Sequence, residues 1–245
     1  MNKYFYDLHI HSALSSCADD DMTPNNIAGM AMLNGLNLIA LTDHNSCGNC
    51  EAFFKACSKQ GIIPIAGMEL TTAEEIHMVC LFEFLEEALE FDKALDEYRI
   101  KIKNKAEVFG NQLYIDKDDN ITGTEDYYLT VATMLNLDDS VKLVKQYNGF
   151  IYPAHVERTS NGIISILGTL PDEPYFDIIE FADTAKIEEL TAKKPELKDK
   201  RILTGSDAHN LWTINEAENF LEIDDEPYSS AYVRKQFFKY LRGEA

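Results

Sequence analysis

Short apolar runs alternate with segments of helical period along most of this chain. In the N-terminal half we predict strands at the apolar runs, from Tyr4 to His11, Leu36 to Asp43, Ile62 to Leu70 and Ile76 to Phe82. Runs that are apolar almost throughout are typical of parallel strands covered on both faces. Helices are expected between them, from Thr23 to Gly35, Glu51 to Gln60 and Leu85 to Asn104, with Thr23-Pro24 as a start signal and Gly61 as a stop signal.

The alternation resumes in the C-terminal half, with strands expected from Gly149 to His155, Phe176 to Ala182, Arg201 to Ser206 and Phe220 to Ile223, and helices from Val141 to Asn148, Ile187 to Leu197 and Ser229 to Arg242. Lys105 to Asp138 has no clear period, and we expect a small inserted cap there, with a turn at Asp116 to Asn120 and a helix at Asp126 to Leu135. About seven or eight strands, mostly separated by helices, predict an α/β protein with a closed or nearly closed βα barrel. No linker divides residues 1–245, so one domain is expected.

Composition narrows the class of protein. The 245 residues include 22 Lys and Arg against 42 Asp and Glu, which gives a formal net charge of −20. Because polynucleotide phosphates are bound mainly by Lys and Arg, long DNA or RNA is a poor expected partner, whereas a small anionic substrate is compatible with bound metal ions. We expect no membrane span, because no apolar run reaches the roughly 20 residues required. The N-terminus lacks the apolar region of a signal peptide, so we expect a cytoplasmic protein, with its oligomeric state left open.

The polar residues of interest fall at the ends of the predicted strands. Such ends meet at one face of a parallel barrel, where active sites are built. All six histidines lie at or near strand ends: His9, His11, His44, His77, His155 and His209. His9 and His11 are two residues apart, so they face the same side of a strand, and Asp207 and His209 repeat that spacing. A single histidine would more often be a core or surface residue, and Asp43 or Glu69 alone could cap a helix. Their co-occurrence predicts a shared site, whose imidazole and carboxylate ligands suit Mn²⁺, Zn²⁺ or Fe²⁺.

Five short motifs sharpen this prediction: Asp-Leu-His-Ile-His-Ser, Leu-Thr-Asp-His-Asn, Gly-Met-Glu-Leu, Pro-Ala-His and Gly-Ser-Asp-Ala-His. With them the sequence, from Asp7 to His209, resembles the PHP family, named for polymerase and histidinol phosphatase. The resemblance implies a distorted (β/α)7 TIM-like barrel that holds two to three divalent metal ions. It also implies hydrolysis of a phosphate ester by metal-activated water.

The resemblance also implies a role for individual residues. One metal would be held by His9, His11, Glu69 and Asp207. A second would be held by His44, His209 and an acidic residue after the first motif, where counting back from Thr23-Pro24 gives Asp19, with Asp20 as the alternative. A third would lie between Glu69, His77 and His155. Asp43 would orient a ligand, and Arg158 would bind the phosphate, unless it is a surface arginine paired with a nearby acid.

The predicted substrate is a small phosphate ester, and the resemblance implies a nucleotide or a metabolite like histidinol phosphate as candidates. Substrate choice is expected to be set by the Lys105 to Asp138 insert. An amidohydrolase-type barrel, which also begins with His-x-His, and a non-catalytic regulatory metal-binding module are the alternatives. A thioredoxin-like pair, Cys47 and Cys50, would leave the histidines unexplained, and the odd count of five cysteines favours reduced thiols. Asp116 to Asn120 resembles the start of a calcium loop but lacks the glycine and glutamate that such a loop needs later on.

Overall fold

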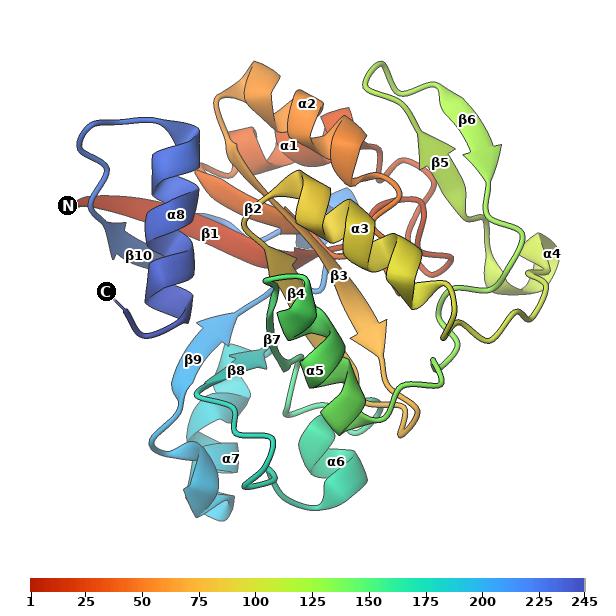
Figure 1. Cartoon of the computed structure of the whole chain (residues 1–245). Helices are drawn as coiled ribbons and strands as arrows, with labels where there is room; N and C mark the ends of the chain where they lie inside the picture. Colours follow the sequence, from red (N-terminus) through yellow and green to blue (C-terminus); the bar gives the residue numbers. More distant parts are fainter. Residues whose placement is uncertain (245) are drawn as a thin grey trace.

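The apolar runs form the centre of a curled sheet in the computed structural model, which describes residues 1–244 (Figure 1). Six strands pair in the order β10-β1-β2-β3-β4-β7, and β8 pairs with β9. The strands of this framework are β1 (Asn2–Ile10), β2 (Leu38–Leu41), β3 (Ile63–Thr71), β4 (His77–Phe82), β7 (Phe150–Pro153), β8 (Ile178–Phe181), β9 (Arg201–Thr204) and β10 (Phe220–Ile223).

Strand direction decides which strand ends share a face. β1, β2 and β3 are parallel, β4 is antiparallel to both β3 and β7, and β8 and β9 are parallel to each other. β7 therefore runs in the same direction as β1 to β3. A bridge between Ile10 and Ala208 connects the end of β1 with the segment after β9 and helps the sheet to curl round. The predicted α/β, distorted-barrel fold is confirmed, with β4 reversed.

Both faces of the central strands are covered. The helices are α1 (Pro24–Leu33), α2 (Cys50–Gln60), α3 (Leu85–Leu95), α4 (Ala106–Phe109), α5 (Leu137–Gln146), α6 (Ile163–Leu167), α7 (Ile187–Lys193) and α8 (Ser230–Leu241). Along β2, Ile39 and Leu41 belong to the core shared with α1 and α2, whereas Leu38 and Ala40 belong to the core shared with α8. This two-sided burial is the reason that β2 and β3 read as continuous apolar runs. Figure 1 places α8 and β10 beside both termini.

The expected helix signals operate at α1 and α2. The Thr23 hydroxyl accepts a hydrogen bond from the Asn26 N–H at 3.2 Å, and Pro24 begins α1. Gly61 ends α2 in the left-handed conformation, with φ of 71°. A residue other than glycine would be strained there. The sequence therefore defines these ends through local chemistry.

Two predicted helices differ from the structure. The helix expected to reach Asn104 stops at Leu95, and Arg99 beyond it donates to the Asn45 carbonyl at 2.9 and 2.6 Å. No helix forms at Asp126 to Leu135 in the described chain, where backbone N–H groups bond to distant partners instead: Thr133 N–H to the Thr71 carbonyl at 2.9 Å, and Leu129 N–H to the Gln112 side chain at 2.9 Å. These tertiary bonds satisfy the backbone and override weak local preference.

The segment expected to be an insert contains α4 and a hairpin of β5 (Leu113–Ile115) and β6 (Ile121–Thr124), which projects from the sheet in Figure 1. Between these strands, the Asp116 carboxylate accepts 2.9 Å bonds from the N–H groups of Asp118 and Asn120. Such bonding is that of a polar turn. The segment meets the barrel where Leu113 N–H donates to the Ala13 carbonyl at 2.8 Å. Its role in substrate choice stays a prediction.

Across residues 1–244, none of the helices combines the length and the apolar character that a membrane span would need.

Candidate metal centre

The predicted ligands converge at one face of the curled sheet. His9 and His11 lie at the end of β1, Glu69 lies near the end of β3, and four further residues follow the ends of other strands: His44, His155, Asp207 and His209. His77 was expected within a strand, with its side chain pointing into the same space. It is instead the first residue of β4, and it reaches this face because β4 runs in the opposite direction.

The Glu69 carboxylate is the centre of the cluster. Its Oε1 lies 2.7 Å from Nδ1 of His77, 3.0 Å from Nε2 of His155 and 3.4 Å from Nε2 of His9. Its Oε2 lies 2.9 Å from Nδ1 of His44 and 3.4 Å from Nε2 of His11. A buried carboxylate with five imidazoles around it can bridge cations through its two oxygens.

Three overlapping groups have ligand atoms close enough to share an ion. They are His9, His11, Glu69 and Asp207; His44, Glu69 and His77; and His11, His44 and His209. The first group is the set expected for one metal. His155 is absent from the second group but touches Glu69, and Asp19 is absent from all three. The metal-ligand roles of these residues stay predictions, which their proximity supports.

The donor set suits divalent transition metals. Within residues 1–244, His44 Nδ1 and Glu69 Oε2 lie 2.9 Å apart and are buried, but neither has a hydrogen bond of good geometry. Buried polar atoms normally have such a bond, so this pair is compatible with a cation between them. Imidazole with carboxylate favours Mn²⁺, Zn²⁺ or Fe²⁺ over Ca²⁺. The residues therefore fit the two or three ions that the family resemblance implies.

Glu180, in β8, was not singled out from the sequence. Its Oε1 lies 2.8 Å from Nδ1 of His9 and accepts a 3.2 Å bond from the His155 N–H, and the side chain is fully buried. A carboxylate on the far nitrogen of a ligating histidine fixes the tautomer and orientation of the ring. The available signal was a single acid inside the apolar run Ile178 to Phe181.

Asp43 hydrogen-bonds to two serines, one of which contacts histidines of the cluster. Its carboxylate accepts from the Ser12 N–H at 2.7 Å and from the hydroxyls of Ser12 and Ser15 at 2.6 and 2.8 Å. The Ser15 hydroxyl lies 2.9 Å from Nδ1 of His11 and accepts from the His44 N–H at 3.1 Å. Asp43 thus contacts two histidines indirectly, through Ser15, and its role in orienting ligands stays a prediction.

The backbone is strained at two members of the cluster. His155 has a φ of 27° and Asp207 a φ of 51°. Residues other than glycine avoid this region, which costs about 1–3 kcal/mol and persists where the surroundings enforce it. In these conformations Nε2 of His155 lies 3.0 Å from Oε1 of Glu69, and Oδ1 of Asp207 lies 3.0 Å from Nε2 of His11.

The carboxylates and imidazoles shift one another's pKa values. Burial disfavours charge on His9, but Glu180, Glu69 and Asp207 outweigh it and raise the pKa of His9 well above its usual value. Burial likewise opposes ionisation of Glu69, but His77, His9 and His44 outweigh it and hold the Glu69 pKa well below the usual range. His11 is different, because burial and the neighbouring His209 and His44 lower its pKa. In this centre Glu69 is therefore held ionised, protonation is favoured at His9, and protonation is disfavoured at His11.

Arg158 was predicted to bind phosphate, with a surface ion pair as the alternative. The structure pairs its guanidinium with the Asp207 carboxylate, while 42% of its side chain stays exposed. Arg158 therefore lies at the rim of the cluster. Its role toward phosphate stays a prediction.

The loop after the first motif carries Asp19 and Asp20, whose ligand role stays a prediction. Asp19 is exposed, with its N–H bonded to the His209 carbonyl at 2.8 Å, and the Asp20 carboxylate accepts from Asn111 at 2.7 Å. The thiol in the same loop is that of Cys17, which is exposed. Burial raises its pKa, but interaction with the imidazoles of His209 and His44 prevails and lowers that pKa to about 6.

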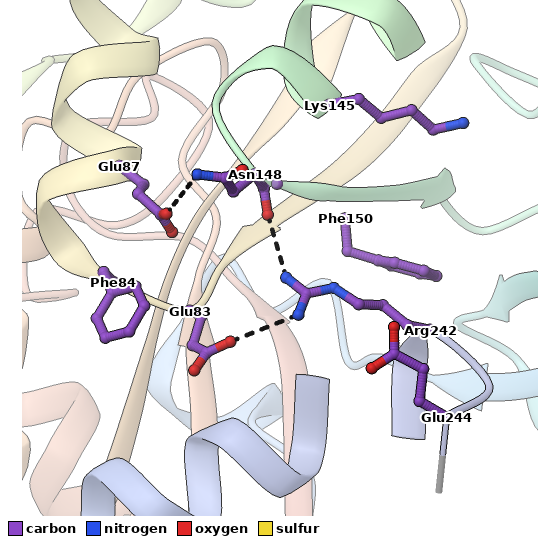
Figure 2. Close-up of a pocket in the computed structure, with 9 residues that line it drawn as sticks. Glu83, Phe84, Glu87, Lys145, Asn148, Phe150, Arg242 and Glu244 are labelled. Carbon is purple, nitrogen blue, oxygen red and sulfur yellow. Dashed lines mark hydrogen bonds and ion pairs between the residues drawn. The ribbon is translucent and has the colours of Figure 1, made fainter. Parts of the chain in front are cut away.

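The other thiols and hollows lie elsewhere. Cys47 and Cys50 are buried against the Gly67 carbonyl. Burial and the neighbouring Cys50 raise the pKa of Cys47, which is the opposite of what an activated redox thiol needs. Figure 2 shows a hollow in which Arg242 reaches Glu83 and the Asn148 carbonyl. Glu83 follows the end of β4 and Phe150 begins β7, so this hollow is at the opposite end of the sheet from the metal centre.

Residues 7–164 match the PHP domain family, and the chain belongs to that family. The chain is 33% identical over 114 residues to a 5'-3' exoribonuclease of Haemophilus influenzae, an alignment covering 43% of this chain and 40% of the relative. It is 35% identical over 77 residues to an error-prone DNA polymerase of Symbiobacterium thermophilum, covering 31% of this chain and 7% of the relative. These alignments thus span less than half of either relative.

Two solved structures show the same fold. The lesion-specific endonuclease Q of Pyrococcus furiosus superposes with a TM-score of 0.70 at 19% identity, covering all of this chain and 57% of the endonuclease. A protein of Bifidobacterium adolescentis assigned as a metal-dependent phosphoesterase superposes with a TM-score of 0.61 at 17% identity, covering 96% of both chains. The family match ends at residue 164 and therefore does not include Asp207 and His209. The structure places these two residues in the centre.

The comparison corrects one expectation. Long nucleic acid was judged a poor partner because the chain is so acidic, yet endonuclease Q, which shares this fold, has been solved with a 27-mer duplex substrate. The inference was wrong because net charge sums the whole surface, whereas binding depends on the field at the site. Bound cations can reverse that local field.

Proposed function

We propose that this protein is a metal-dependent phosphoesterase whose centre is built around Glu69. The observation that carries the proposal is the contact of one buried carboxylate with five imidazoles. Divalent ions held there would generate a nucleophile from water at neutral pH and neutralise charge on the phosphoryl group. Phosphoryl transfer asks mainly for positioning and charge stabilisation, so no nucleophile from the protein is required.

We assign the residues of the cluster to three roles: holding ions, positioning the ligands and binding the phosphate. His9, His11, Glu69 and Asp207 would hold one ion, His77 and His155 would join Glu69 at another, and His44 and His209 would hold a third. Glu180 keeps the His9 ring in place, and Asp43 does so for His11 through Ser15. Arg158, paired with Asp207 and partly exposed, would fork onto the phosphate at the rim.

The substrate we propose is a phosphate ester that can reach the rim beside Arg158. Small phosphomonoesters, including nucleotides, remain the first candidates. The names of the relatives, an exoribonuclease and a polymerase among them, make the ends of polynucleotides equally worth assaying. The hairpin of β5 and β6 would shape which of these is accepted.

The test is phosphate or nucleotide release from phosphomonoesters, nucleotides and short oligonucleotides in the presence of Mn²⁺. Wild type is compared with Glu69→Gln and with Glu189→Gln, a control for loss of one carboxylate, since Glu189 is exposed on α7. We expect release by wild type and Glu189→Gln alone. Release by Glu69→Gln at the wild-type rate, or none by a wild type that has bound its metals, would overturn the proposal.

A further inference from the structure

A run of basic residues stands out in this acidic chain. From Arg99 to Lys105, four of seven residues are basic and none is acidic, although the whole chain has 22 Lys and Arg against 42 Asp and Glu. Lys101, Lys103 and Lys105 are exposed. Lys101 is bonded to Asp96 at 2.9 Å, whereas within residues 1–244 no carboxylate lies at ion-pair distance from Lys103 or Lys105. These two ammonium groups are therefore free to meet an external anion.

Aromatic rings lie beside these lysines. An antiparallel bridge pairs Lys103 with Tyr127, and the Lys101 ammonium lies 5.8 Å from the centre of the Tyr127 ring. The Phe109 and Tyr128 rings stack with centroids 4.5 Å apart. Phe109 and Tyr127 remain 40% and 37% exposed. We define the basic-aromatic strip as Arg99 to Lys105 together with Phe109, Tyr127 and Tyr128.

One end of the basic-aromatic strip lies against the metal centre. The Arg99 guanidinium donates to the Asn45 carbonyl at 2.9 and 2.6 Å, and Asn45 directly follows His44. Arg99 also forms a bridge with Thr133, whose N–H donates to the Thr71 carbonyl at the end of β3 at 2.9 Å. The strip therefore extends outward from the residues that flank the proposed ligands.

A polar hollow of about 320 Å³ lies beside Lys103. Its lining includes amide and carboxylate side chains, those of Asn104, Asn111, Gln112, Glu125 and Asp126. Amide and carboxylate groups bond to the edges of nucleobases, lysines bind phosphates, and aromatic rings stack on base faces. An acidic polypeptide would be attracted by the lysines but repelled by the two carboxylates. The combination therefore fits a polynucleotide better than it fits an acidic polypeptide.

We propose that the basic-aromatic strip binds a single-stranded polynucleotide whose end reaches the metal centre, with Lys103 and Lys105 on its phosphates and Tyr127 stacked on a base. The proposal rests on the proposed function and names a substrate class for it. A single strand is favoured because a duplex hides the base faces that aromatic rings contact. The acidic surface does not oppose this binding, because salt screens exposed charges beyond about 10 Å and leaves the nearby lysines to set the local field.

The experiment is fluorescence anisotropy of a short labelled phosphorothioate strand, which keeps the backbone charge but resists hydrolysis. It is titrated with the full chain in Mn²⁺ at several salt concentrations. In Lys103→Gln combined with Lys105→Gln, we expect Kd to rise about tenfold. The slope of log Kd against log salt should fall by about 1.4, since each lost phosphate contact removes about 0.7. Tyr127→Leu should also raise Kd about tenfold, with the slope unchanged.

The matched control is Lys193→Gln combined with Lys198→Gln. Both lysines are exposed and precede β9, whose end leads to Asp207, so they lie toward the opposite end of the sheet from the metal centre. We expect this control to bind the strand as wild type does. Circular dichroism checks that each variant is folded.

Hydrolysis assays separate this proposal from the proposed function. KM for an unmodified strand should rise in the variant lacking Lys103 and Lys105, while kcat/KM for para-nitrophenyl phosphate stays that of wild type. Equal Kd in this variant and in the control, tighter binding of a duplex, or equal competition by polyglutamate would overturn the polynucleotide site and leave the metal centre intact. Strand binding that depends on the strip, in a wild type that hydrolyses no phosphate ester, would support the strip and overturn the proposed function.

Discussion

Oε1 of Glu69 lies 2.7 Å from Nδ1 of His77 although the two residues are on strands that run in opposite directions. Glu69 is directly opposite Val79 in the pairing of β3 with β4, and His77 is two residues before Val79. Residues two apart face the same side of a strand, so Glu69 and His77 meet diagonally on one face of the sheet. This pairing brings a residue from the start of a strand into a centre otherwise built at strand ends.

Replacing Glu69 by Gln should remove the shared ligand of the proposed centre. The amide keeps the volume but loses the charge that holds several imidazoles in place, so we expect at least one ion per chain to be lost. Phosphoester hydrolysis should fall by about a hundredfold or more. Elemental analysis and phosphate release measure the two effects. Glu189→Gln is the matched control, and equal metal content in both variants would contradict this role.

Glu180→Gln tests whether the carboxylate behind His9 tunes the proposed ligand. The amide oxygen can still accept from the His9 ring, but the negative charge is lost, so metal affinity should weaken by about 10-fold to 100-fold with the fold retained. Competition with a chromogenic chelator measures this affinity. A full loss of folded protein, rather than of affinity, would show that Glu180 is needed for packing instead.

The contrast between Glu69 and Glu180 shows what the sequence can and cannot predict. Glu69 stands in a recognisable motif at a strand end, so it was found. Glu180 lies inside an apolar strand, and its partner His9 is 171 residues away in the chain, a relationship that only tertiary structure provides. The framework was predictable because two-sided burial leaves continuous apolar runs in β2 and β3. The reversal of β4 was not, because its pairing partners are not encoded in a local pattern.

Arg158→Lys should separate phosphate binding from charge balance. Lysine keeps the positive charge beside Asp207 but cannot form the two parallel bonds that a guanidinium makes to a phosphate. We expect KM for the best phosphomonoester to rise by about tenfold, with metal content unchanged. Steady-state kinetics and metal analysis provide the two readings. An unchanged KM would assign Arg158 to its ion pair alone.

Phe237→Ala should affect stability without affecting the centre. Phe237 is fully buried in α8, in the core shared with β1, β2 and β3, away from the metal ligands. Removing a buried phenyl ring typically costs about 3–5 kcal/mol through lost transfer energy and the cavity left behind. Urea denaturation should show this loss, while the metal content of the folded fraction stays that of wild type. A loss of metal from folded protein would contradict the separation of the two regions.

The affinity for metal should rise with pH through the neutral range. In the metal-free protein, burial opposes charge on His9 and His44. The carboxylates of Glu180, Glu69 and Asp207 outweigh it at His9, and Glu69 with the Cys17 thiol outweighs it at His44, so both pKa values are raised well above the ordinary value of about 6.5. A proton on either ring competes with a cation, so binding must displace it, and affinity falls as pH falls through the raised pKa values. Glu69 adds nothing to this dependence, because its lowered pKa keeps it ionised. Calorimetry in buffers of different ionisation enthalpy, at about pH 6, 7 and 8, should detect proton release on Zn²⁺ binding. Glu180→Gln should reduce that release by removing the largest charge that favours protonated His9, and an affinity independent of pH in wild type would show that these imidazoles are not ligands.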